Sequence, residues 1–486
     1  MMRSVPAARL VVLLGDWRAE HGLARRPLAE RLGAGLRALV LDGRLPVGVR
    51  LPAERDLATA LGVSRGVAAA AYDGLRDAGL LQRRVGAGSF TALPEDAVVP
   101  AGGWGPRIGG EGDVVDLTMA TMAAPVGAVL EATRWAADAL PAQLGGTGYD
   151  LLGLLELRVA VAERYAAAGV PTTPDQVLIT TGGQAAVDLV ARTLLAPGDA
   201  ALLESPAYPN AIDALRTARA RLQPVPVDQE EGWDAGLLVD ALRRGPRLAY
   251  LVPDFQNPTG CVMPAETRQR VLDMARRAGS LLVVDEALID VALEGERPDH
   301  TAALASGAAG GSLLTIGSLS KPVWGGLRVG WVRADPTLVR RIADVRAASD
   351  MGPPVLGQLV AVHLLRILDD VLAERRTVLR AQRDALVAAL AAHLPEWRVR
   401  PPRGGMSLWI SLDVPASTAL AAAAPDRGLR LAAGPRFGLD GSFDRFLRLP
   451  FTHPEPVLVD AVERLAALWP AVAGRGTAGT PPRVLV

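Results

Sequence analysis

The first ninety residues contain three short amphipathic patterns separated by turn-forming residues. Leucines recur every three or four positions over 28–39, which predicts a helix that ends near residue 42. Pro52 suits the first turn of a second helix, and Ser64 suits the N-cap of a third that runs to about residue 78. Residues 81–92 have the pattern of a β-hairpin. This order of elements predicts a winged helix-turn-helix.

In a winged helix-turn-helix, the third helix enters the major groove of DNA and the hairpin lies beside it. The other interpretation is that this small unit only packs on the larger domain and uses arginine as a solubilising residue. The coincidence of the turn, the cap and the basic residues favours DNA binding. The candidate DNA-binding residues are Ser64, Arg65 and Gly66 at the start of that helix, Arg55 on the preceding helix, and Arg83, Arg84 and Gly88 on the wing.

From about residue 114, strand-like apolar runs alternate with alanine-rich helical segments, which predicts an α/β domain around a mainly parallel sheet. Residues 1–92 form the expected DNA-binding domain, 93–113 a flexible linker rich in proline and glycine, 114–470 the large domain, and 471–486 a disordered tail. The expected strands are 176–181, 200–204, 248–252, 281–285, 313–317 and 329–333, with helices such as 185–195 and 264–278 between them.

The charge is unevenly distributed along a chain whose formal net charge is zero. Residues 1–94 carry 14 arginines against 8 acidic residues, so this end is basic and the remainder is acidic. A basic front end suggests an anionic partner. The single cysteine, Cys261, excludes an internal disulfide and fits a reducing cytoplasm. No apolar run approaches the ~18 residues that a membrane span needs. We expect a soluble, cytoplasmic protein without a metal site.

Lys321 is the only lysine among the 52 basic residues counted as lysine or arginine. A genome rich in G and C would explain why lysine is scarce, but not why the remaining one lies here. An amine, unlike a guanidinium, can lose its proton and attack a carbonyl. Lys321 follows the apolar run 313–316 and is surrounded by small residues that allow a close approach to a ligand. This position favours a Schiff-base lysine.

Further candidate residues follow the other predicted strands, where ligands of such sheets bind. Gly183 and Gln184 open a helix whose N-terminus favours a phosphate, and any tight strand-to-helix turn would also use glycine. Asn257 lies in an Asn-Pro-Thr-Gly sequence that is also a turn in its own right. Buried Asp285 needs a cation, such as a protonated pyridine. With Tyr208 as a ring stacker and Ser318 and Arg328 as phosphate ligands, these residues make up the inventory of a site for pyridoxal 5′-phosphate (PLP).

Two family resemblances add to this interpretation. Residues 51–58, 61–65, 71–72 and 86–90 resemble the GntR family of DNA-binding domains, in which the arginines matching Arg55 and Arg65 contact DNA. Gly66 departs from that family's pattern and should cost the helix about 1 kcal/mol relative to alanine. Residues 114–470 resemble the fold-type I aminotransferases, which implies an α/β domain with a smaller α+β C-terminal subdomain.

The aminotransferase resemblance implies a role for each candidate residue. Lys321 would form the internal aldimine, and Arg448 would clamp a substrate α-carboxylate, although Arg448 is also explicable as a surface arginine on a late strand. Tyr149 would reach the phosphate of the neighbouring subunit, which implies a homodimer. The remaining ligands would be Asp285 for the pyridine nitrogen, Asn257 for the ring 3′-oxygen, Tyr208 stacked on the ring, and Gly183, Gln184, Ser318 and Arg328 for the phosphate.

One departure from the aminotransferase pattern bears on function. These enzymes usually have a tyrosine two places after the residue that matches Asp285, and Ala287 stands there in this chain. PLP binding should survive, but full transamination is in doubt, so whether the domain is an enzyme is left open.

The two halves together resemble the MocR (GabR-like) transcriptional regulators. We therefore expect a PLP-dependent regulator, homodimeric and head-to-tail, that senses an amino compound by aldimine exchange at Lys321 and binds double-stranded DNA. The alternatives are an active aminotransferase that retains a DNA-binding appendage, and a DNA-binding protein whose large domain is only a scaffold. The effector, the target gene and the direction of regulation stay open.

Overall fold

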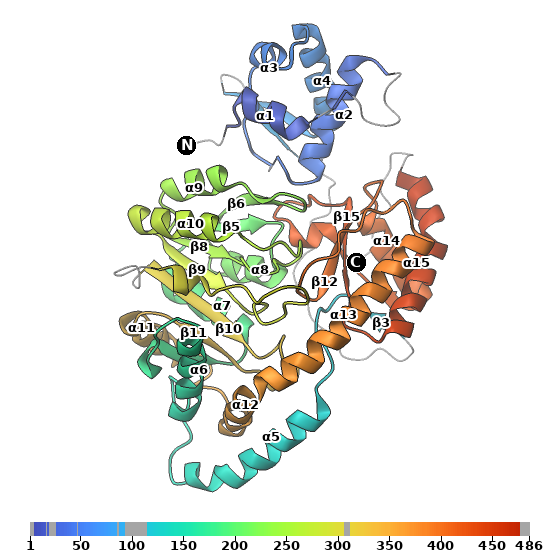
Figure 1. The fold of residues 1–486 in the computed structure, drawn as a ribbon. Helices are drawn as coiled ribbons and strands as arrows, with labels where there is room; N and C mark the ends of the chain where they lie inside the picture. The colour runs from blue at the N-terminus through green and yellow to red at the C-terminus, as the bar shows by residue number, and fades with distance from the viewer. Residues whose placement is uncertain are drawn as a thin grey trace.

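The computed structural model describes residues 4–15, 17–18, 26–45, 47–84, 87–92, 114–305 and 312–476. Figure 1 shows a small helical domain, in blue, resting on a larger α/β domain. The expected linker, 93–113, lies outside the described residues, as do Val85 and Gly86. Among the described residues, no helix is both long enough and apolar enough to cross a membrane.

The small domain has the predicted helices and hairpin. Tight turns and caps explain its local geometry: Gly62 ends α3 in the left-handed conformation (φ +64°), and the Ser64 hydroxyl accepts a hydrogen bond from the Val67 amide at 3.3 Å. Tyr72 is buried and donates its hydroxyl to the Pro52 carbonyl at 2.9 Å. The elements are α1 (Ala7–Leu14), α2 (Leu28–Leu41), α3 (Glu54–Leu61), α4 (Arg65–Asp77), β1 (Leu81–Arg84) and β2 (Gly88–Thr91).

The sequence did not predict α1. This helix is eight residues long and has no side-chain cap, so its local signal is weak. Leu10 is fully buried in the core of the small domain, which indicates that packing rather than local preference holds α1 in place.

A sheet in the order β4-β11-β10-β9-β8-β5-β6-β7 forms the centre of the large domain. The strands are parallel except β11, which is antiparallel to both neighbours, and β7, which is antiparallel to β6. The α/β fold and the mainly parallel sheet are therefore confirmed. The strands are β4 (Val177–Thr180), β5 (Ala200–Ser205), β6 (Arg221–Asp228), β7 (Gly232–Trp233), β8 (Leu248–Leu251), β9 (Leu281–Asp285), β10 (Leu313–Ser318) and β11 (Gly330–Arg333).

Strand β6 was not predicted because Pro224 and Pro226 interrupt its apolar pattern. Proline cannot donate to a sheet ladder and is tolerated where a strand has no full partner on one side. That condition holds here, since β7 pairs only with Val227 and Asp228 at the end of β6.

Helices cover both faces of the sheet, and the strand residues alternate between two cores. Leu202, Leu282 and Val284 face one core, whereas Leu203 and Val283 face the other. The first core includes residues of α5 (Val126–Ala139), α6 (Leu155–Ala167), α9 (Ala235–Arg243), α10 (Ala265–Ala278) and α12 (Val355–Arg366); the second includes those of α7 (Gly183–Leu194), α8 (Pro209–Thr217) and α11 (Pro336–Arg346).

The C-terminal subdomain is α+β, as expected. Its antiparallel sheet has the order β12-β15-β14, formed by Ser407–Ser411, Phe446–Pro450 and Ala432–Ala433. The segment that follows the linker also belongs here, because β3 (Val115–Asp116) pairs with β13 (Leu429–Arg430). The helices are α13 (Leu368–His393), α14 (Ser417–Ala423) and α15 (Glu455–Gly476).

Helix α15 continues to Gly476, past residue 470 where we expected the domain to end, and Trp469 packs edge-to-face on Trp397 in its core. The rest of the expected tail lies outside the described residues.

The small domain contacts the large domain of its own chain through few residues. Arg44 pairs with Asp228 (Nε–Oδ2 3.3 Å), and Arg9 pairs with Asp234. The Phe443 amide donates to the Leu41 carbonyl at 2.6 Å. The end of α2 therefore lies against the subdomain that carries β15 (Figure 1).

Candidate cofactor site and nucleic-acid interface

Lys321 and Asp285 lie together because β10 and β9 are parallel neighbours in the sheet. Ile316 pairs with Asp285 in this register, so both strands end at the same edge of the sheet. The Lys321 amine donates to the Ala120 carbonyl at 2.8 Å. Burial and the nearby Arg448 charge lower its pKa to about 8, while Asp285 acts in the opposite direction. An amine with this pKa is neutral more often at physiological pH than an ordinary lysine.

Asp285 is buried at the end of β9 and is held by two hydrogen bonds. The Tyr250 hydroxyl donates to Oδ2 at 2.6 Å, and the Ala287 amide donates to Oδ1 at 2.9 Å. Burial raises the pKa of Asp285, and the hydrogen bonds and Lys321 oppose this. Sequence reasoning missed Tyr250, although a tyrosine inside the otherwise apolar strand β8 was a signal that could have found it.

A concave backbone turn connects β4 to α7. Gly182 has φ +85°, and a Cβ there would lie 2.9 Å from Nη2 of Arg328. Gly183 is the first residue of α7, and a Cβ there would lie 3.5 Å from the Ser318 Cβ. Arg328 donates to the Thr181 carbonyl at 2.7 Å. A helix N-terminus, a serine and an arginine thus lie close together, and these groups suit a phosphate.

Gln184, also expected at the phosphate, donates instead to the Asn210 carbonyl at 3.1 Å. Its buried Oε1 has no hydrogen-bond partner among the described residues, and the same is true of the Ser320 hydroxyl beside Lys321. Unsatisfied buried polar atoms of this kind indicate that the site is built for a further polar group.

Arg448 on β15 is 1% exposed and faces the same site. Its guanidinium donates to Asn257 Oδ1 at 3.5 Å and to the Thr118 carbonyl, and burial lowers its pKa to about 10. Its position excludes the interpretation of Arg448 as a surface arginine.

Tyr208 is also close to this group. Burial, followed by the charge of Asp285, raises the pKa of Tyr208 to about 12. The Tyr208 hydroxyl accepts a hydrogen bond from Asn210 at 3.1 Å.

The segment 116–123 borders the site and was not found from the sequence. It contributes two backbone acceptors, the carbonyls of Thr118 and Ala120. Arg375 of α13 fixes the segment by donating to the Ala123 carbonyl at 2.8 Å and to the Val323 carbonyl at 2.6 Å. Backbone carbonyls have no side-chain signature, which is why the pattern of residues did not reveal them.

Tyr149 lies outside this group. Its side chain is 70% exposed, which leaves it accessible to a partner. Ala287 contributes only its backbone amide, and no side-chain hydroxyl stands at that position.

Two of the candidate DNA-binding residues, Arg55 on α3 and Arg65 on α4, are strongly exposed. The side chains of Arg55 and Arg65 are 84% and 76% exposed, and their ion pairs with Asp56 (3.8 Å) and Glu54 (4.0 Å) are long. Gly66 follows on the same turn of α4, and a Cβ there would touch only the Ser64 hydroxyl, at 3.8 Å.

On the wing, Arg83 and Arg84 are exposed, and the Arg84 guanidinium lies 4.7 Å from the centre of the Phe90 ring. Gly88 has φ +106°, a conformation that favours glycine, and Arg50 packs against it. The roles of these residues on DNA stay predictions.

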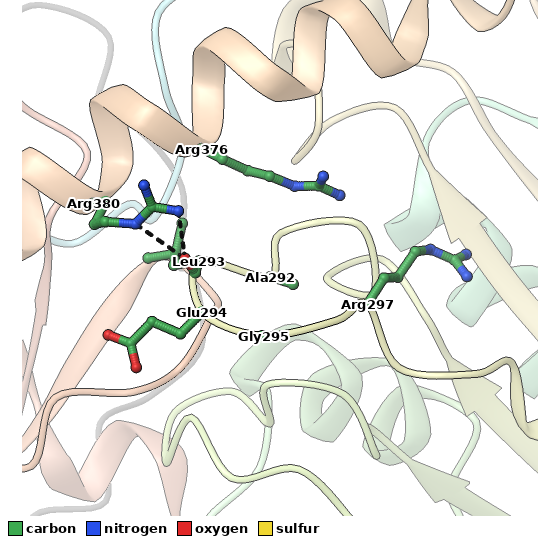
Figure 2. Close-up of a pocket in the computed structure, with 7 residues that line it drawn as sticks. All are labelled: Ala292, Leu293, Glu294, Gly295, Arg297, Arg376 and Arg380. Carbon is green, nitrogen blue, oxygen red and sulfur yellow. Dashed lines mark hydrogen bonds between the residues drawn. The ribbon is translucent and has the colours of Figure 1, made fainter.

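A separate cavity of about 430 Å³ lies between the loop 292–297 and α13, and Figure 2 shows the side chains around it. Arg376 donates to the Asp290 carbonyl, and Arg380 donates to the Leu293 carbonyl. These arginines attach the loop to α13, and the cavity contains none of the candidate cofactor residues.

Comparison with known proteins supports the assignment of both the small domain and the large domain. Residues 118–465 match the family "Aminotransferase class I and II", and residues 28–91 match "Bacterial regulatory proteins, gntR family". The probable rhizopine catabolism regulatory protein MocR of Rhizobium meliloti is 31% identical over 403 residues, which cover 76% of this chain and 78% of that protein. The 2-aminoadipate transaminase of Thermus thermophilus is 34% identical over 318 residues, 64% of this chain and 79% of that protein.

Solved structures support the assignment of the aminotransferase domain. The α-aminoadipate aminotransferase LysN from Thermus thermophilus, complexed with N-(5′-phosphopyridoxyl)-L-leucine, has a TM-score of 0.69 and 30% identity. The match covers 75% of this chain and 94% of that one. A kynurenine aminotransferase from Pyrococcus horikoshii has a TM-score of 0.68, 25% identity, and coverage of 74% and 91%.

The fold and the site therefore define a DNA-binding regulator fused to a PLP-type aminotransferase domain. The chain belongs to the MocR group of GntR-type transcriptional regulators. Both resemblances and the fold class are confirmed, and PLP is the cofactor that the domain implies. The lysine, the buried carboxylate and the glycine turn fit this cofactor.

Proposed function

We propose that the large domain senses an amino compound at Lys321 and that this changes how the protein binds its operator. The observation that carries the proposal is one amine of lowered pKa beside Arg448, in a site that also contains Asp285. When bound there, PLP supplies an aldehyde that reacts with amines and a ring that draws electrons. Lys321 and an incoming amine would compete for that aldehyde.

The chain provides a place for the lysine after it is displaced. The Lys321 amine reaches the Ala120 carbonyl at 2.8 Å, so a released ammonium already has an acceptor. Arg448 would bind a carboxylate of the incoming compound, which favours amino acids over simple amines. Asp285, held by Tyr250, would pair with the ring nitrogen of the cofactor.

Variants at Lys321 test this proposal. Lys321→Ala and Lys321→Arg should both lose the response of operator binding to amino acids, since neither side chain can bond to the cofactor aldehyde. Lys321→Arg is the matched control because it retains a positive charge. Both variants should retain effector-independent operator binding and a cooperative thermal transition. A Lys321→Arg protein that still responds normally to amino acids would refute exchange at this residue.

The titration itself requires no knowledge of the operator. Candidate amino acids are added to the PLP-loaded protein and the visible absorbance is followed. We expect at least one amino acid with an α-carboxylate to change the spectrum, and Arg448→Gln to weaken that change by tenfold or more, about the loss of one buried charge-assisted pair. Equal affinities in both proteins would remove Arg448 from effector binding.

We also propose that the protein is a homodimer. Several large apolar side chains are exposed on or next to α5, α6 and α12, and a second subunit would cover them. They are Val126, Leu130, Leu144, Leu155 and Leu356. Tyr149, exposed in the same part of the chain, would then reach the partner's phosphate site. Light scattering at several concentrations measures the mass directly.

The head-to-tail arrangement stays a prediction. In this structure the small domain contacts the large domain of its own chain, and a head-to-tail dimer would form these contacts between subunits. Arg44→Cys and Asp228→Cys together, in a Cys261→Ser background, would distinguish contacts within one chain from contacts between subunits. The first arrangement would give an intrachain disulfide and the second an interchain disulfide. A protein that acts on an operator in this way would work in the cytoplasm.

Residual aminotransferase activity is the second candidate, favoured by the buried position of Arg448 and by the relatives named above. Ala287 counts against it, since no hydroxyl stands at that position. Steady turnover of an amino acid with a keto acid, well above that of free PLP, would establish this alternative.

A further inference from the structure

We propose that four aromatic side chains transmit the state of Arg448 to the winged helix-turn-helix. These residues are Phe437, Trp409, Phe443 and Phe446, here called the aromatic relay. The proposal rests on the function proposed above, because it assumes that Arg448 faces the effector. It adds the surface through which the two domains communicate.

The first end of the relay touches the effector site. The Arg448 guanidinium lies 5.1 Å from the centre of the Phe437 ring, a distance at which a cation and an aromatic face attract each other. The Phe437 carbonyl also accepts a hydrogen bond from the Ala207 amide at 2.9 Å, next to Tyr208. Phe437 is fully buried and closely packed, so a shift of Arg448 or of the Tyr208 segment must also move the Phe437 ring.

The middle of the relay is a set of packed rings. Trp409 meets Phe437 edge-to-face, with ring centres 5.3 Å apart, and stacks on Phe446 at 5.1 Å with an angle of 3°. Phe443 meets both Trp409 and Phe446 edge-to-face, with ring centres 6.1 Å apart in each pair. Such pairs have preferred geometries, so a movement of one ring changes the position of the next.

The other end of the relay is the contact with the small domain. The Phe443 amide donates to the Leu41 carbonyl at the end of α2. Its ring lies so close to Gly43 that a Cβ at that residue would be 2.3 Å from the ring carbon Cζ. Phe443 itself has φ +76°, a conformation that bulky residues rarely adopt. The strained conformation of Phe443 lies at the contact itself. This is what we expect of a segment that switches between a contacting and a released arrangement.

The rest of the contact is suited to opening. The ion pair between Arg44 and Asp228 is partly exposed, and such pairs stabilise little. Cavities of about 380 and 340 Å³, both lined by Arg44, show that the two domains do not pack closely around it. A loosely packed, polar contact beside one aromatic anchor can be released without unfolding either domain.

The test uses hydrogen–deuterium exchange of the full-length, PLP-loaded protein, read in peptides that cover 38–45 and 439–446. Arg44→Glu and Asp228→Arg should each raise exchange in both peptides by about threefold or more, and the double variant should restore it. Unchanged exchange in the single variants would show that the contact does not form in solution and would overturn the proposal.

The relay itself is tested by Phe437→Leu, which removes an edge-to-face pair without touching the small domain. Exchange in peptide 38–45 should rise about fivefold, the effect of losing one such pair. Arg448→Gln should act in the same direction. Trp397→Leu is the matched control, since it removes the edge-to-face pair with Trp469 in the same subdomain.

If Phe437→Leu leaves peptide 38–45 unchanged, or if Trp397→Leu alters it equally, the relay is refuted. Neither measurement uses an effector, so this result is independent of whether an amine exchanges at Lys321.

Discussion

The lowered pKa of Lys321 predicts a specific pH dependence for cofactor loading. With a pKa of about 8, about one-tenth of the Lys321 amines are neutral at pH 7, half at pH 8 and nine-tenths at pH 9. An ordinary lysine would be neutral in only about one molecule in three thousand at pH 7. Because only the neutral amine attacks an aldehyde, loading should accelerate about tenfold from pH 6 to 7 and level off above pH 8 to 9.

The neighbouring charges determine the sign of the mutant effects. Arg448 lowers the pKa of Lys321, so Arg448→Gln should raise it and move the plateau to higher pH. Loading at pH 7 should therefore become slower. Asp285 raises the same pKa, so Asp285→Asn should move the plateau in the opposite direction.

Stopped-flow absorbance of the cofactor-free protein mixed with PLP measures these rates between pH 6 and 10. Dividing each rate by the rate constant of PLP with the neutral form of a small amine, calculated from the known pKa of that amine, removes the titration of the aldehyde itself. Lys321→Arg gives the background. A normalised rate that still rises tenfold from pH 9 to pH 10 would refute the assigned environment of Lys321.

Three further predictions follow from the described contacts. Arg65→Ala should weaken operator binding and reduce the slope of log affinity against log salt by about 1, measured by fluorescence anisotropy at several salt concentrations. Arg268→Met should lower the free energy of unfolding by about 3–5 kcal/mol in urea titrations, because it leaves Asp254, which Arg268 contacts at 2.6 Å, buried without its cation. Tyr250→Phe removes the 2.6 Å hydrogen bond to Asp285, so PLP affinity should fall about tenfold or more in absorbance titrations, with little change in melting temperature.

Much of the fold was predictable because its signals are local. The cap at Ser64, the glycine turn at 182–183 and the apolar strands up to Asp285 each depend on a few adjacent residues. Helix α1 and strand β6 were missed because tertiary packing determines both of them.

The site residues likewise divide into those with a signal in the sequence and those that only the folded chain reveals. Lys321 and Asp285 carry distinctive chemistry that marked them as candidates, whereas Arg448 was identified only through the aminotransferase resemblance. The contributions of Thr118 and Ala120 are backbone carbonyls, and Phe437 contributes an aromatic face far from Lys321 in sequence. Such groups become recognisable only when the chain has brought them together.

The scarcity of lysine also has an electrostatic consequence for the whole molecule. Exposed guanidinium groups retain their charge up to pH 12 or above, and all the basic residues other than Lys321 and the 5 histidines are arginines. Between about pH 8 and 10, the positive potential that arginine side chains present to a nucleic acid is therefore nearly constant. Over the same interval the Lys321 amine changes from half protonated to neutral. Alkaline titration is thus a selective perturbation, able to neutralise Lys321 while the exposed arginines of the small domain retain their charge.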